Sequence, residues 1–351
     1  MALPTPMEHS LPPPTPEPPR DTFSMAVGAY NGILSKARLQ LEAAPAWVTA
    51  TAETALWPGV MASALIAADI QFHQGIHESL IASSVLFGSL ATVATAERLI
   101  PIRPEDNERD PNDIKLNLTN IVFSETAFPL LTFMPLANFG ENSSEGLNLW
   151  SHLPHKQITE WLTTNGILAD ASASLIEHSL DFGAALLIAE FANYWSHRLT
   201  HIVPDFWPIH FIHHTPEYLT ATAAGRSHPL NIWTAFAGAA VLKFLNVPVE
   251  TIMLTLVTSS AMAFLQHANA RMRLGFLSKI FISPEAHRLH HSRDPKHFDK
   301  NFGMVITVWD HVFGTYMEDN TLATGTLEPS PRTYFEQLAH PFKKWATAFG
   351  L

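Results

Sequence analysis

Three short histidine clusters constrain this chain more than any other feature, because each can aim two or three imidazoles at one point. The spacing is H-x-x-x-H once and H-x-x-H-H twice, and on a helix positions i, i+3 and i+4 share one face. Neutral imidazole is the commonest metal ligand among side chains and suits iron, zinc, copper and nickel. Eight histidines are too many for one ion and suit two. They are His197, His201, His210, His213, His214, His287, His290 and His291.

Composition narrows the class of protein. Charged residues make up 15% and hydrophobic residues 47% of the 351 residues, whereas an average soluble protein has about 25% charged residues. This balance indicates a membrane protein with a sizeable polar part. The net charge of −11 argues against a nucleic-acid partner. Cysteine is absent, which excludes iron–sulfur clusters, thiolate-bound haem and zinc–cysteine sites.

Six apolar segments predict an all-α fold with four to six membrane-inserted helices. Several approach the roughly 20 residues that cross a bilayer, although buried core helices are the competing interpretation. If all six cross, lysine and arginine gather on the side of the N-terminus, which predicts a multi-pass protein with its histidine clusters in a cytoplasmic helical cap. The segments are 55–71, 78–97, 116–137, 179–196, 230–247 and 249–266.

We expect four regions along the chain. They are a disordered proline-rich tail (1–22), membrane helices with a polar loop (23–180), a histidine-box catalytic domain (181–320) and an amphipathic tail (321–351). The last region either lies on the membrane or packs on the catalytic domain. Pro341 is expected to break or kink any single helix there.

The histidine clusters follow membrane exits, so their metals are expected to meet a lipid-dissolved substrate. The first cluster continues the fourth apolar segment, and the second follows two prolines, Pro204 and Pro208. The third starts after Ser283, which precedes Pro284 and is predicted to cap a helix. His267 ends the last apolar segment on the same side, which makes it a ninth candidate ligand.

Further polar residues near the clusters are candidates for an additional ligand or for supporting contacts. Acids beside metal-bound histidines usually orient the imidazole N–H. Two of the candidates, Asp299 and Asn301, fit structural caps equally well. The full set is His228, Asp205, Asp294, Asp299, Asn301 and Asp310.

Over roughly residues 85–320 the chain resembles the fatty acid hydroxylase/sterol desaturase superfamily of integral-membrane di-iron enzymes. The likeness is most specific in five stretches: 190–201, 205–216, 226–229, 266–271 and 283–316. One departure is Asn231, where the family usually has an acid. The resemblance implies two irons held by the eight cluster histidines and His267, with O₂ as co-substrate. It implies hydroxylation or desaturation of a lipid such as a sterol or fatty acyl chain.

The two electrons that such a reaction needs are expected from a separate reductase with a ferredoxin or cytochrome, because no nucleotide or haem motif is visible. Its docking site is predicted on four arginines, although anionic lipid headgroups would suit them as well. Two rival functions are a membrane zinc hydrolase, which lacks the usual H-E-x-x-H helix, and an inactive metal-binding relative. The arginines are Arg271, Arg273, Arg288 and Arg293.

Overall fold

The computed structural model describes residues 22–76, 78–104, 111–128, 150–319 and 323–350, which form helices and loops with no strand beyond isolated bridges. The predicted all-α class is confirmed across these ranges. The α-helices are α1 (Thr22–Glu42), α2 (Ala46–His73), α3 (Glu78–Leu99), α4 (Pro111–Phe128), α6 (Pro154–Thr164), α7 (Asp170–Ile202), α8 (Trp207–His214), α9 (Ile232–Phe244), α10 (Val249–His267), α11 (Pro284–His290), α12 (Val308–Phe313) and α13 (Tyr334–Ala348). The 3-10 helices are η3 (Trp150–His152), η4 (Ala221–Gly225), η5 (Pro229–Asn231), η6 (Gly275–Lys279) and η7 (Pro295–His297).

The six apolar segments fall on α2, α3, α4, α7, α9 and α10 in that order. Two of these helices, α2 and α10, are long and apolar enough to cross a membrane. At 1.5 Å per residue, α9 with its 13 residues would reach only about 20 Å, short of a hydrocarbon core of roughly 30 Å. The larger number of spans therefore stays a prediction. The proline-rich tail and the end of the third segment, 129–137, lie outside the described residues.

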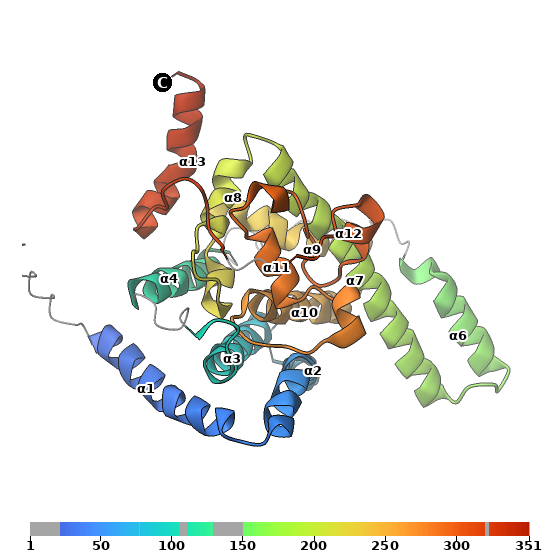
Figure 1. Ribbon diagram of the computed structural model, residues 1–351. Coiled ribbons are helices and arrows are strands. Elements are labelled where there is room, and N and C mark those ends of the chain that lie inside the picture. Colours follow the sequence, from blue (N-terminus) through green and yellow to red (C-terminus); the bar gives the residue numbers. More distant parts are fainter. Residues whose placement is uncertain (1–21, 77, 105–110, 129–149, 320–322, 351) are drawn as a thin grey trace, which may run out of the picture.

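Helix α10 forms the centre of the molecule and packs against α2, α3, α7 and α11 (Figure 1). Its buried residues Val257 and Ala261 join a core with Val60 and Ala64 of α2. The four-residue spacing within each helix places both side chains of a pair on one face. This core fixes the end of α10, where His267 stands, relative to the N-terminal helices.

Helix α7 is the longest helix, and its first half projects from the body beside α6 (Figure 1). Its second half packs on α9 where Gly238 meets Ala189, at so close an approach that a Cβ on Gly238 would lie 2.8 Å from the carbonyl oxygen of Ala189. Asn193 of α7 accepts the backbone N–H of Gly238 at 2.8 Å. This tight contact positions the last turns of α7, which carry the first histidine cluster.

The C-terminal helix α13 packs on α8 and α4. Pro341 was expected to break or kink a helix. It does not break one, because α13 continues through this proline. A capping box at Thr333 holds the start of α13, and the buried Gln337 accepts a hydrogen bond from Asn120 of α4 at 3.0 Å. These attachments offset the one backbone hydrogen bond that a proline cannot donate.

Candidate metal centre

The nine histidines lie in two groups, each small enough to surround one ion. Within each group one ring nitrogen of every member lies within 4.8 Å of the others. The five-histidine group contains His197, His201, His210, His214 and His290. The four-histidine group contains His213, His267, His287 and His291.

Helical geometry explains how one H-x-x-H-H cluster serves both groups. A helix turns by about 100° per residue, so positions i and i+4 differ by about 40° and position i+3 lies about 60° to the other side. In α8, His210 and His214 enter the five-histidine group, and His213 turns to the other group. In the third cluster the assignment is reversed: His287 and His291 enter the four-histidine group, and His290 enters the five-histidine group. Each of these two H-x-x-H-H clusters therefore contributes to both groups, whereas His197 and His201 both belong to the five-histidine group.

Backbone carbonyls fix the protonation state of four of these imidazoles. A carbonyl oxygen can only accept, so the Nδ1 atom that contacts it carries the proton and Nε2 keeps a free lone pair. This arrangement is typical of metal-ligating histidine. The Nδ1 contacts are His197 to Phe302 (2.9 Å), His213 to Arg226 (3.1 Å), His267 to Ala263 (2.6 Å) and His290 to Lys300 (2.8 Å).

The Nε2 atoms converge in a way that calls for a cation. His213 and His267 approach with their Nε2 atoms 3.2 Å apart, and both of these nitrogens lack a proton. Protonation is no remedy at neutral pH, because burial lowers the pKa of His213 to about 4. In the five-histidine group, the Nε2 atoms of His201 and His290 are buried without a partner. Two opposed lone pairs and two buried ring nitrogens without a partner fit bound metal ions.

The loop 300–306 supports the five-histidine group from behind. Its Lys300 and Phe302 supply the carbonyls for two ligands, and Asp310 holds the loop by accepting the N–H groups of Phe302 and Gly303, both at 2.8 Å. Glu190 of α7 accepts three further N–H groups, those of residues 304–306, at 2.7–3.3 Å. The loop is thus held by two buried carboxylates.

Glu190 is a supporting residue of the site that the sequence patterns did not single out. It stands seven residues before His197 on the same helix, which is two turns and the same face. The signal was an acid deep inside a largely apolar segment, where an unpaired charge would be costly.

The other predicted polar residues take different places. Asp299 lies with Oδ1 3.9 Å from Nδ1 of His201, beyond hydrogen-bonding distance. Asn301 is saturated by backbone partners at Ala286 and Met317, so it holds loops together. Asp205 and Asp294 are exposed, and Asp294 caps η7.

Two residues of the 226–231 loop are both buried but differ in role. His228 stands outside both groups, with Nδ1 accepting from the N–H of Leu230 at 3.0 Å and Nε2 3.2 Å from the carbonyl oxygen of Leu338. Asn231, at the position where the resembled family has an acid, faces Nδ1 of His210 with its Oδ1 at 3.3 Å. The substitution therefore keeps an acceptor for a cluster histidine.

A cavity of about 270 Å³ opens onto both groups. It reaches His197 and His210 of one group and His213, His267 and His287 of the other. Its opposite walls are largely apolar and come from α3, α4, α9, α10 and α13. They include Leu86, Ile121, Phe123, Phe236, Phe264 and Tyr334.

A second cavity, of about 360 Å³, adjoins the remaining members of the five-histidine group. His201, His214 and His290 line it together with Trp207 and Asp299, and it shares no lining residue with the first cavity. The five-histidine group is therefore reached from two separate spaces.

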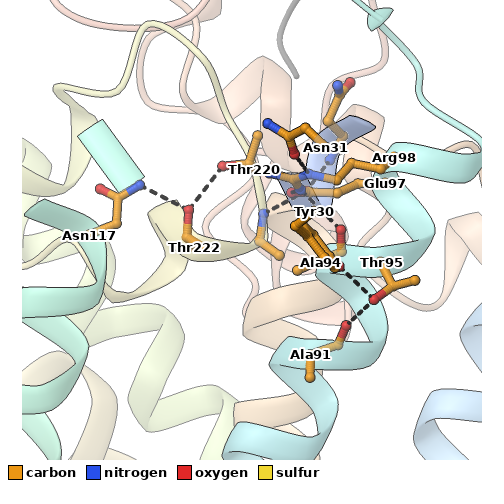
Figure 2. Close-up of polar contacts among 12 residues, drawn as sticks. Tyr30, Asn31, Ala91, Ala94, Thr95, Glu97, Arg98, Asn117, Thr220 and Thr222 are labelled. Carbon is orange, nitrogen blue, oxygen red and sulfur yellow. Dashed lines mark hydrogen bonds and ion pairs between the residues drawn. The ribbon is translucent and has the colours of Figure 1, made fainter. Parts of the chain in front are cut away.

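Helices outside the histidine clusters anchor the four-histidine group. Figure 2 shows Glu97 and Arg98 of α3 beside Asn31 of α1. Glu97 accepts the N–H groups of Ala221 at 3.0 Å and of Asn269, two residues after His267, at 3.3 Å. α3 thereby holds the chain on which His267 stands.

A parallel network ties α4 to His213. The carbonyl partner of His213 belongs to Arg226, whose buried guanidinium bonds to Asp113 and Asn117. Asn117 also donates to Thr222 at 3.1 Å, and Thr222 contacts Thr220 (Figure 2).

Four arginines were predicted to form a docking surface for the electron donor. The prediction is wrong for one of them, which is buried, and two others form ion pairs within the protein. Arg288 is only 2% exposed and donates to the carbonyl of Leu219, so it offers no surface to a partner. Arg271 and Arg273 both pair with the buried Glu53, which offsets one of their two positive charges. Sequence alone does not show whether a side chain within a histidine cluster, such as that of Arg288, points into the protein or toward solvent.

Comparison with known proteins supports the resemblance. Residues 182–315 match the family model described as fatty acid hydroxylase. An ornithine lipid hydroxylase, OlsE, of Rhizobium tropici is 27% identical over 302 residues, covering 84% of this chain and 85% of that protein. No solved structure gives a significant match.

Alkylglycerol monooxygenases match a shorter region. The human protein is 32% identical over 168 residues, which cover 47% of this chain and 37% of that protein. The Caenorhabditis elegans protein is 31% identical over 134 residues, 37% of this chain and 26% of that protein. The chain thus spans about a third of their length or less, and the relatives are lipid hydroxylases and monooxygenases. The region that carries the histidine clusters thus matches the fatty acid hydroxylase family, within the superfamily that the sequence resembles.

Proposed function

We propose that this chain is a membrane di-iron oxygenase that uses O₂ and two electrons to hydroxylate, or alternatively desaturate, a C–H bond of a lipid. The observation that carries the proposal is one largely apolar cavity reaching histidines of both groups. A lipid in that cavity would place a carbon beside the two metals. The hydroxylase and monooxygenase names of the relatives favour this reaction over hydrolysis.

The donor set suits two irons. Neither group contains a carboxylate among its ligand atoms, and all nine imidazoles are proposed as ligands. Imidazole also suits zinc, but zinc has no redox chemistry. Iron bound there would supply the redox centre at which O₂ is activated.

The chain's own residues hold and orient these ligands. The carbonyls of Phe302, Lys300 and Arg226 keep the Nδ1 proton in place, so each Nε2 lone pair faces its group. The apolar walls keep water away from the reacting carbon. Asp310 and Glu190 act through the loop they hold, so they are positioning residues.

The membrane setting of the site is part of the proposal. The candidate spans α2 and α10 support membrane insertion, and the lysine and arginine pattern supports a cytoplasmic site. The catalytic unit proposed is 181–320, with membrane helices before it. A separate reductase with a ferredoxin or cytochrome would supply the electrons. It would meet the exposed Arg293 rather than the inward-facing Arg288.

Metal analysis combined with isotopic oxygen tests the proposal. Purified protein should hold about two irons per chain, and ¹⁸O₂ with a reductant should give a lipid product heavier by one labelled oxygen, or lighter by two hydrogens. His213→Ala and His214→Ala each remove a ligand from a different group and should abolish turnover. Active protein that holds only zinc, or product formed without O₂, would contradict the proposal and favour the zinc hydrolase.

A further inference from the structure

One amide in the wall of the cavity has no partner inside the protein. Gln266 lines the cavity and is 3% exposed, and its Oε1 is buried without a hydrogen bond. Within the described part of the chain, its Nε2 atom forms no hydrogen bond either. Buried amides are nearly always paired, so an unpaired one inside a cavity points to a ligand.

The other buried amides of the cavity wall are already engaged. Asn231 faces Nδ1 of His210 and donates to Ser227 at 3.1 Å. Asn120 donates to the carbonyl of Leu116 at 2.9 Å and to Gln337 at 3.0 Å. The Gln266 amide therefore differs from its neighbours in having both a donor and an acceptor to offer.

The position of this amide places any hydrogen-bonding partner close to the four-histidine group. Gln266 directly precedes His267 of the four-histidine group, and consecutive Cα atoms are about 3.8 Å apart. Water alone is a poor occupant, because the cavity that Gln266 lines is largely apolar, with side chains such as Leu86, Ile121 and Phe264 in its wall, and a buried water needs two or more polar partners. A lipid that carries a polar group fits the apolar cavity with its chain and supplies the amide with a hydrogen-bonding partner.

We infer that Gln266 hydrogen-bonds a hydroxyl or amide group of the lipid substrate, close to the carbon that reacts. The inference rests on the proposed function and narrows its substrate to polar-headed lipids oxidised near the head group. An alkane chain would leave the amide unpaired. A site built to hydrogen-bond a substrate group discriminates strongly against analogues that lack it.

Equilibrium binding of two matched lipids tests this inference. The probes are 1-O-hexadecylglycerol, with two hydroxyls, and hexadecyl propyl ether, in which hydrogen replaces both. Full-length protein in nanodiscs should bind the glycerol lipid about tenfold more tightly than the ether. In Gln266→Met, a substitution of similar shape, the two affinities should become equal. Gln157→Met on the exposed face of α6 is the matched control and should keep the preference.

Two binding results would overturn the inference. One is wild-type protein that does not distinguish the lipids, which needs no variant to fold. The other is an unchanged preference in Gln266→Met that still holds its metals. Because binding is measured without O₂ or reductant, a preference that persists in a protein without oxygenase activity contradicts the proposed function alone. With turnover, oxygen inserted in mid-chain rather than beside the glycerol would also refute the inference.

Discussion

Replacing Gly303 with alanine should loosen the loop that supports the five-histidine group. A Cβ at this position would lie 2.3 Å from the carbonyl oxygen of Ile306 and 2.9 Å from Oδ2 of Asp310. Real Cβ contacts almost never fall below 3.0 Å, and the first of these neighbours is backbone that cannot swing aside. The loop must therefore open, which moves Gly303 away from Asp310 and shifts the Phe302 carbonyl that orients His197.

The expected cost follows from the two contacts affected. Overpacking costs about 1–3 kcal/mol, and losing a hydrogen bond to a charged group costs about 1.5–3 kcal/mol. A total of about 3–5 kcal/mol lowers Tm by about 6–20 °C, at roughly 2–4 °C per kcal/mol. Disturbing the partner of a ligating histidine also weakens metal binding by about 10–100-fold.

Thermal unfolding and metal content per chain, measured on the same preparations, check this prediction. The control is Gly183→Ala in α7, where an added Cβ meets nothing within 4 Å. In a helix this change should be neutral or stabilise by about 0.5–1 kcal/mol. Gly303→Ala protein that matches the control in both Tm and metal content would refute the supporting role of the loop.

Three more outcomes are expected. Arg226→Met removes the buried guanidinium from Asp113 and Asn117 and should cost about 1.5–3 kcal/mol, with metal analysis showing loss of one ion while the second is retained. Gly225→Ala would place a Cβ 2.0 Å from Cγ1 of Ile121 in the cavity wall, so product formation should fall at unchanged metal content. Removing the metals with a chelator should lower Tm, because ions that bind only the folded state add about 2.7 kcal/mol at a hundred times their Kd; an unchanged Tm would argue against a metal centre.

The spacing of the histidines predicted much of the site, because helical periodicity depends on sequence alone. It pointed to convergence of the clusters, and His267 joined them since it ends an apolar helix on the same side. The supporting contacts were predicted less well. Acids were expected to orient the imidazoles, yet backbone carbonyls of residues 300, 302, 226 and 263 do so for four of them. A carbonyl belongs to every residue and leaves no mark in a sequence.

The sequence also did not predict which side chains are buried by residues far away along the chain. Arg288 sits within a polar cluster and would be judged exposed, but the fold turns it inward. The helix through Pro341 depends on a cap and on packing against α8 and α4, which no local pattern around the proline reveals. Both errors concern what a residue meets across the fold rather than which element it forms.

The two histidine groups depend on different parts of the chain. The five-histidine group is supported by the 300–310 loop, which lies inside the region matched by the fatty acid hydroxylase family, 182–315. The four-histidine group relies on Glu97 of α3 and Asn117 of α4, both outside that region. The N-terminal helices therefore support the four-histidine group, as the loop supports the five-histidine group. Substitutions in α3 or α4 should weaken the four-histidine group first, whereas substitutions in the loop should weaken the five-histidine group.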